Sequence, residues 1–163
     1  MNPEPPLVVR MATPSDTPQI LTFIHALAEY ERLAIEVVAT EDGLRRSLFG
    51  DRPFAECAIA EWEGKPAGFA LYFHNYSTFL GQPGIYLEDL FVIPDLRGRG
   101  VGKALLRHLA RLAVERGCGR FEWAVLDWNE PAIRFYESIG AVAQNEWTVY
   151  RLKGQALRKL AGP

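Results

Sequence analysis

Hydrophobic and polar positions follow two alternating periods along the first half of the chain. Residues 7–12 (LVVRMA) predict a strand, and apolar residues at helical spacing within 20–30 predict a helix after it. A second, short helix is expected over 41–48, with Thr40 as its N-cap. The period then changes to two in AECAIAEW and AGFALYFHN, which the turn EGKP joins into a hairpin.

The second half of the chain predicts a central strand followed by alternating helices and strands. The run 85–93 is apolar at nearly every position, as in a strand covered on both faces. A helix over 101–116, a strand in RFEWAVLDW and a helix in NEPAIRFYESIG follow, and WTVYRL is expected to close the sheet. A short basic helix ends the chain. The order predicts an α/β fold in which helices pack on a mixed sheet.

Length, charge and cysteine content limit the function classes. A chain of 163 residues is long enough for one core, so we expect a single domain over 1–163. With Lys+Arg 18 against Asp+Glu 20, nothing in the charge favours a nucleic-acid partner. Cys57 and Cys118 have no metal-type spacing, so neither a metal site nor a disulfide framework is expected. MNPEPPL resembles no signal peptide and no segment is long enough to span a membrane, so we expect a cytoplasmic protein without a membrane partner.

The stretch DLRGRGVGK, residues 95–103, suggests a binding site for an anion. It is not a P-loop, which would need glycine in place of Arg97 and Ser or Thr in place of Ala104, and its glycines do not fit the dinucleotide fingerprint. Glycines at a strand-to-helix junction still let backbone N–H groups approach phosphate oxygens at a helix N-terminus. The alternative is a tight turn with solvated basic side chains. Those basic side chains are Arg97, Arg99 and Lys103.

Three segments in this order resemble the GNAT superfamily of acyl-CoA-dependent N-acetyltransferases. They are YLEDLFV, the run RGRGVG that begins at Arg97, and WNEPAIRFYESIGA about thirty residues later. Together with VVRMATPSDTPQILTFIHALAEYE, they are similar to the diamine (spermidine/spermine) acetyltransferase branch and its thialysine-acetylating relatives, over nearly the whole chain. The resemblance implies the GNAT fold, with a mixed, mostly antiparallel central sheet flanked by helices. It also implies acetyl-CoA as donor, a primary amine of a small molecule as acceptor, and a homodimer.

The resemblance assigns the acetyl-CoA site to three parts of the chain. In the family, pantetheine pairs with the strand before the loop, the loop holds the pyrophosphate, and the start of the following helix contacts the cofactor from the other side. The corresponding residues here are Leu90, Phe91, Val92, Arg97, Gly98, Arg99, Gly100, Val101, Gly102, Lys103, Asn129, Glu130, Pro131 and Ala132.

Two catalytic residues are expected, Glu88 and Tyr136. An alkyl amine is protonated at neutral pH and must lose its proton before attack. A carboxylate in a buried strand, Glu88, is suited to orient the amine and take that proton, directly or through water. Asp89 ranks second, because strand alternation places it on the opposite face. The resemblance assigns protonation of the CoA thiolate to Tyr136, whose other interpretation is an aromatic residue with a buried ring and a solvated hydroxyl.

The acceptor site is also assigned by resemblance. Its residues are Tyr30, Glu31, Glu88, Asp89, Glu122, Trp123 and Ala124. After Glu31 the polyamine enzymes carry further acidic residues, whereas this chain has Arg32, Ala34 and Ile35. A shorter amine or a lysine analogue therefore fits at least as well as a long polyamine. Two other functions stay open: acetylation of proteins or peptides, and non-catalytic binding of acyl-CoA.

Overall fold

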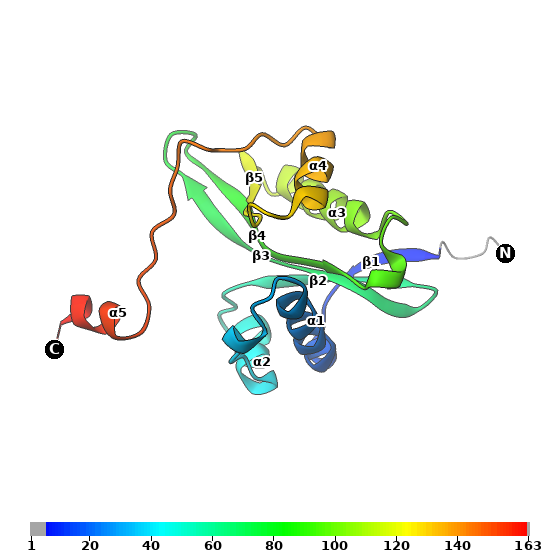
Figure 1. Ribbon diagram of the computed structural model, residues 1–163, viewed down its shortest axis with the longest axis horizontal. Coiled ribbons are helices and arrows are strands. Elements are labelled where there is room, and N and C mark those ends of the chain that lie inside the picture. Colours follow the sequence, from blue (N-terminus) through cyan, green and yellow to red (C-terminus); the bar gives the residue numbers. More distant parts are fainter. Residues whose placement is uncertain (1–5, 163) are drawn as a thin grey trace. The chain divides into compact units, whose positions relative to one another are not determined.

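The computed structural model describes residues 6–162, and the chain divides into two compact units, one ending at Ala124 and the other starting at Val125. The first unit contains a five-stranded sheet in the order β1-β2-β3-β4-β5 (Figure 1). Its strands are β1 Leu7–Met11, β2 Glu56–Trp62, β3 Lys65–Ser77, β4 Gln82–Val92 and β5 Arg120–Trp123. Neighbouring strands are antiparallel except β4 and β5, which are parallel. The predicted mixed, mostly antiparallel sheet is confirmed.

The turn between β2 and β3 confirms the predicted hairpin. Glu63 and Gly64 have φ angles of 50° and 74°, and a two-residue turn with both central residues in the left-handed region matches the twist of the two strands. The next strand is longer than the sequence suggested. It starts at Gln82 rather than Ile85, because pairing between β3 and β4 continues as far as Ser77 and Gln82.

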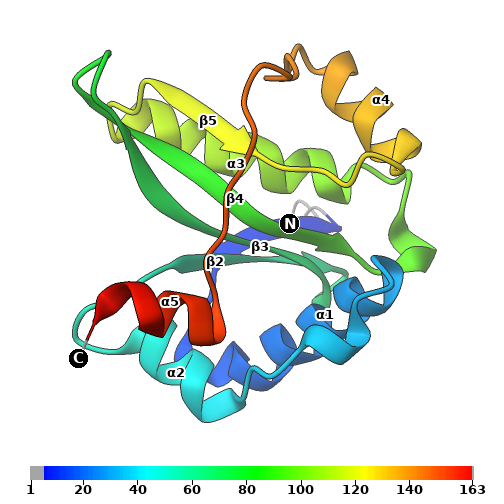
Figure 2. The same cartoon turned by 60° about the vertical axis from the view of Figure 1, so that its left-hand side comes forward.

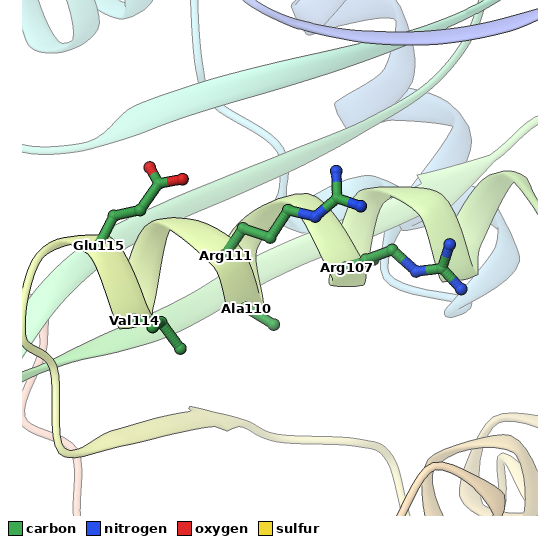
Figure 3. Close-up of a pocket in the computed structure, with 5 residues that line it drawn as sticks. All are labelled: Arg107, Ala110, Arg111, Val114 and Glu115. Carbon is green, nitrogen blue, oxygen red and sulfur yellow. The ribbon is translucent and has the colours of Figure 1, made fainter.

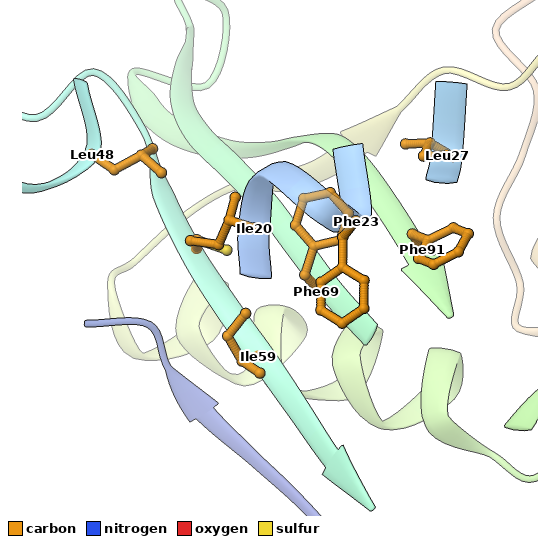
Figure 4. Packing of buried hydrophobic residues seen from close by; sticks show 8 residues of the cluster. Ile20, Phe23, Leu27, Leu48, Ile59, Phe69 and Phe91 are labelled. Atoms are coloured by element: carbon orange, nitrogen blue, oxygen red, sulfur yellow. The ribbon is translucent and has the colours of Figure 1, made fainter. Parts of the chain in front are cut away.

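Helices α1 (Thr17–Tyr30) and α2 (Glu41–Phe49) cover one face of the sheet, and Thr40 caps α2 by accepting a hydrogen bond from the Gly43 N–H. Figures 1 and 2 show both helices on the same side. The core beneath them joins side chains of α1, α2, β2, β3 and β4 (Figure 4): Ile20, Phe23, Leu27, Leu48, Cys57, Ile59, Phe69 and Phe91. Burial of this apolar cluster holds α1 against β4, the strand expected to carry the site.

Helix α3 (Val101–Glu115) packs on the other face of the sheet (Figure 1). Leu105 and Leu109 lie at helical spacing on its inner side and are fully buried. Glycines in the left-handed conformation bound the helix at both ends, Gly100 with φ 87° and Gly117 with φ 67°. The predicted helix 101–116 is confirmed to within one residue.

The second unit contains α4 (Glu130–Ser138) and α5 (Gly154–Ala161). Both helices were predicted, but the strand expected in WTVYRL is wrong: no strand is formed in residues 125–162. A strand needs a neighbour that satisfies its backbone, and within residues 125–162 no second segment pairs with this one. Trp147, Val149 and Tyr150 are 80%, 82% and 93% exposed. β5 is also shorter than RFEWAVLDW and ends at Trp123.

The described residues contain no disulfide, no membrane-spanning helix and no cluster of metal ligands. Cys57 and Cys118 are free thiols, and burial raises the pKa of Cys57 to about 12. Between residues 6 and 162, no helix combines the length and the apolar composition that a membrane crossing requires. In the same range, no three His, Cys, Asp or Glu side chains are grouped in a way that could hold a metal ion.

Candidate active site

The loop between β4 and α3 is shaped by glycines in the left-handed conformation. After β4 the chain makes a single 3-10 turn over Pro94–Leu96, and Gly98 and Gly100 follow with φ angles of 75° and 87°. Residues with a side chain rarely adopt such angles, and a Cβ at either glycine would meet no atom within 4 Å. The backbone of this loop is therefore exposed directly in front of α3.

The start of α3 adds N–H groups and positive charge to this loop. Because the helix begins at Val101, the N–H groups of its first turn, Val101 to Lys103, have no acceptor inside the helix. The partial positive charge at a helix N-terminus favours an anion. The side chains of Arg99 and Lys103 are exposed beside it. This geometry fits the pyrophosphate site predicted at 98–103.

The two arginines of the loop extend in different directions. Arg97 donates a hydrogen bond from Nε to the Val92 carbonyl oxygen at 3.0 Å. Its guanidinium carbon lies 4.7 Å from the centre of the Tyr30 ring, at the end of α1. Arg99 instead lies over Trp62, at 5.8 Å from that ring's centre. Of these two arginines, Arg97 therefore contacts a predicted acceptor residue, Tyr30, and Arg99 does not.

The C-terminal half of β4 has one edge without a neighbouring strand in the first unit. β5 pairs with β4 over Gly84–Leu87 and ends there. The Ile93 N–H donates a hydrogen bond to the Ala67 carbonyl oxygen of β3 at 2.9 Å, so Ile93 points toward β3. Backbone groups alternate in direction along a strand, so those of Leu90 and Val92 point away from β3. We call this side of residues 88–92 the open edge. An extended ligand with amide groups could pair there as an added strand.

A β-bulge lies at Glu88. Tyr72 is opposite Leu87 and Leu71 is opposite Asp89, so Glu88 is an extra residue without a partner on β3. The expectation that Glu88 is buried is wrong, because the bulge leaves its side chain exposed. The bulge also changes the phase of the strand. Asp89 now aligns with Leu71, which packs against the core under α1.

Asp89 on β4 lies near two other carboxylates, Glu88 and Glu31, and its proton affinity is raised. Asp89 is half-buried, and its pKa is raised to about 6, first by burial and then by the charges of Glu88 and Glu31. Burial also raises the pKa of Glu31. At neutral pH a carboxylate with a pKa of about 6 is still mostly ionised, so it can accept a proton from an amine. The first unit thus brings together three of the predicted acceptor residues.

The other predicted acceptor residues have structural contacts. Glu122 on β5 accepts a hydrogen bond from the Asn75 side-chain amide at 2.9 Å and pairs with Arg120 at 3.1 Å. These contacts compensate its charge, so it is a weaker candidate for holding a cation than Asp89. Trp123 packs edge-on against Phe121, with ring centres 4.9 Å apart, and Ala124 is exposed at the end of the first unit.

The remaining candidates lie on or beside α4, in the second unit. Asn129 occupies the N-cap position without a side-chain capping bond, and Pro131 lies in the first turn, where proline is tolerated. Glu130 pairs with Arg134 one turn later at 3.5 Å. Tyr136 is half-buried, and its ring centre lies 5.7 Å from that of Phe135. Ala132 is half-buried in the same helix.

A shallow hollow on the outer side of α3 contains none of the predicted site residues (Figure 3). It is lined by Arg107, Ala110, Arg111, Val114 and Glu115. Arg107 and Arg111 are solvated on this side of the helix, whereas Arg116 makes two hydrogen bonds to Glu56, at 2.6 and 2.9 Å.

Comparison with known proteins agrees with this geometry. The model of the acetyltransferase (GNAT) family matches residues 22–141, which include the open edge, the loop and α4. The chain belongs to the GNAT acetyltransferase family. It is 40% identical to a thialysine N-epsilon-acetyltransferase of Sus scrofa, over 96% of this chain and 98% of the relative. It is 36% identical to the L-ornithine N5-acetyltransferase NATA1 of Arabidopsis thaliana, over 93% of this chain and 86% of the relative.

A solved structure extends the likeness to the three-dimensional fold. The integron cassette protein VCH_CASS6 of V. cholerae superimposes with a TM-score of 0.80 at 29% identity, covering 98% of this chain and 99% of that one. The predictions of the GNAT fold, the family and an acetyltransferase are therefore confirmed. Acetyltransferases of this family use acetyl-CoA as the acetyl donor.

Sequence reasoning missed two features of this acetyltransferase. The bulge at Glu88 was not foreseen, because YLEDLFV contains no glycine or proline to indicate an irregular strand. The contact between Arg97 and Tyr30 joins residues 67 positions apart in sequence. No local sequence pattern predicts such a pair, because the two residues come together only when α1 packs on β4.

Proposed function

We propose that this GNAT acetyltransferase transfers the acetyl group of acetyl-CoA to a primary amine of a small molecule. The observation that carries the proposal is the arrangement along β4. Carboxylates lie at 88–89 at the start of the open edge, the edge continues to Val92, and the glycine loop begins at 98. A cationic amine and a phosphate-bearing thioester would thus bind at opposite ends of one short strand segment.

The proposed reaction is direct transfer between the two substrates. The amine nitrogen attacks the acetyl carbonyl carbon, the C–S bond breaks, and CoA leaves as a thiolate. Glu88 assists removal of the amine proton, and Asp89 shares that proton because the two carboxylates are electrostatically coupled. Tyr136 protonates the thiolate sulfur. Each group acts as an acid or base, and no metal is needed.

We propose an acceptor with one strongly held cationic end, such as a lysine-like amino acid or a short diamine. Glu31 and Asp89 supply negative charge at the end of α1 and on β4. Beyond Glu31 the segment carries Arg32 and Ile35 in place of further acids, and Ile35 is 94% exposed. Thialysine and ornithine, the acceptors in the names of two relatives, are amino acids with a primary amine on the side chain.

A thiol-release assay with a panel of amines tests this function. We expect a kcat/KM for thialysine, lysine, ornithine or putrescine at least equal to that for spermine, because Arg32, Ala34 and Ile35 stand where further acidic residues could hold the distal charges. One exposed ion pair contributes only about 0.2–1 kcal/mol, so the preference among small amines should be graded. A preference for spermine by orders of magnitude would contradict the assignment of one cationic end. Activity confined to peptide amines would show that the chain acetylates proteins.

Replacing Gly100 by Ala tests the assignment of the loop. The Cβ itself meets no atom, but φ 87° is strained for alanine, at a cost of roughly 1–2 kcal/mol, so the loop backbone is expected to shift. Calorimetry should then show CoA binding weakened about tenfold or more, because the phosphates depend on the N–H directions of this loop.

Gly117→Ala is the matched control for that variant. Gly117 has φ 67° and equally open space, but it lies at the other end of α3. It should lose comparable thermal stability while CoA affinity is retained. Equal CoA affinity of the Gly100 variant and wild type would argue against the loop as the phosphate site.

We further propose a cytoplasmic homodimer built from a single acetyltransferase domain. The family match 22–141 runs across the boundary between the two units, which supports one domain. Exposed aromatic and aliphatic side chains over 147–160 favour burial against a second copy. Two free thiols fit a reducing compartment. Light scattering at micromolar concentration should return a mass near twice 18.3 kDa, and a monomer would refute the dimer.

A further inference from the structure

Arg97 is held by three groups from two elements of the first unit, β4 and α1. Its Nε–H binds the Val92 carbonyl on the open edge, and its guanidinium lies over the rings of Tyr30 and Phe91, at 4.7 and 5.7 Å. Phe91 is buried in the core, whereas Tyr30 is 38% exposed at the last position of α1. The guanidinium thus connects β4 with the helix end that carries Glu31.

Each end of this connection belongs to a different proposed substrate site. Val92 presents its backbone to the open edge, where the pantetheine arm is proposed to pair, and Gly98 directly follows Arg97 in the phosphate loop. Tyr30 directly precedes Glu31, whose carboxylate interacts with Asp89. A change in the position of the Arg97 side chain would therefore affect both the proposed acetyl-CoA site and the proposed amine site.

We propose that Arg97, stacked on Tyr30, couples the binding of acetyl-CoA to the binding of the amine. A guanidinium over an aromatic face fixes both the flexible arginine and the ring beneath it. The substrate that binds first restrains the motion that this pair still has, so the second substrate binds with less loss of conformational freedom. Such coupling is reciprocal: each ligand strengthens the other by the same factor. The inference rests on the proposed function, because it presupposes both sites.

The test measures CoA binding in variants of Tyr30, a residue outside the loop. Calorimetry should show CoA binding about three- to tenfold weaker in Tyr30→Leu, because the arginine loses the ring that orients it. Tyr30→Phe keeps the ring and should bind CoA as wild type does. The reciprocal effect is a KM for the amine raised by a similar factor in Arg97→Gln. Far-UV circular dichroism confirms that each variant is folded.

A double-mutant cycle separates coupling from simple loss of charge. The Arg97→Gln and Tyr30→Leu effects on CoA affinity should be non-additive, since either change breaks the same contact. Arg99→Gln removes the same charge from the same loop but lies over Trp62, so its effect should add to that of Tyr30→Leu. Additive effects at Arg97 and Tyr30, or an unchanged CoA affinity in Tyr30→Leu, would overturn the coupling alone. A wild-type chain that binds no CoA would overturn the proposed function and the coupling with it.

Discussion

Replacement of Tyr136 by Phe is expected to lower kcat by about 10²- to 10⁴-fold while the affinity for CoA is retained, because the change removes the proposed general acid. The variant loses the phenolic proton that is proposed to reach the CoA sulfur, but it keeps the ring that packs beside Phe135 on α4. Steady-state thiol release gives kcat, and calorimetry gives the CoA affinity.

Tyr150→Phe is the control for this experiment. Tyr150 belongs to the same unit, is 93% exposed and has no place in the proposed mechanism, and phenylalanine keeps the ring that the proposed dimer contact would bury, so its variant should turn over like wild type. Single-turnover measurements on the Tyr136 variant complete the test. If acetyl transfer is unchanged there as well, water or another group protonates the thiolate, and the proposed acid is wrong.

Glu88→Gln is expected to reduce kcat/KM by about 10²-fold or more, because the amine loses the carboxylate that is proposed to assist its deprotonation. The pH profile gives a second readout. In the wild type, kcat/KM should inflect near pH 6, where Asp89 titrates, in addition to the continuous rise from deprotonation of the amine. Below that inflection the protonated carboxyl can neither hold the ammonium nor take its proton.

The direction in which Glu88→Gln shifts the inflection of the kcat/KM profile distinguishes Glu88 from a residue that only supports the fold. The charge of Glu88 helps to raise the pKa of Asp89, so Glu88→Gln should move the inflection to lower pH. Glu122→Gln is the matched control, because Glu122 pairs with Arg120 and does not act on Asp89. Full activity in Glu88→Gln together with its loss in Asp89→Asn would transfer the role of base to Asp89.

The predictable parts of the fold are those that depend on local patterns. Gly64, Thr40 and Gly117 act through the chain immediately around them, and each bounds an element as expected. The alternating apolar positions of the β2–β3 hairpin likewise identified both strands. The segment 147–152 has an equally clear strand pattern, but a strand also needs a partner. The pattern therefore predicted a strand that residues 125–162 do not form.

The candidate site was predictable in its parts and not in its electrostatics. The glycine loop follows from spacing and from family resemblance, since its chemistry is carried by consecutive residues. The ranking of Glu88 over Asp89 relied on regular alternation, which the bulge interrupts. The pKa of Asp89 depends on Glu31, which is brought near by the packing of α1 on β4. Such interactions follow from tertiary structure and cannot be read from either segment alone.

The open edge of β4 also has a consequence for the solubility of the unliganded chain. Backbone groups along an unpaired strand edge can recruit a strand from any other molecule, which is how many proteins begin to aggregate. Natural proteins often protect such edges with a charged side chain. Arg97 provides this protection here, since its Nε–H occupies the Val92 carbonyl and its charge lies beside the edge. The backbone groups that would pair with the proposed cofactor are thus shielded from intermolecular β-pairing by Arg97, a residue of the proposed cofactor site itself.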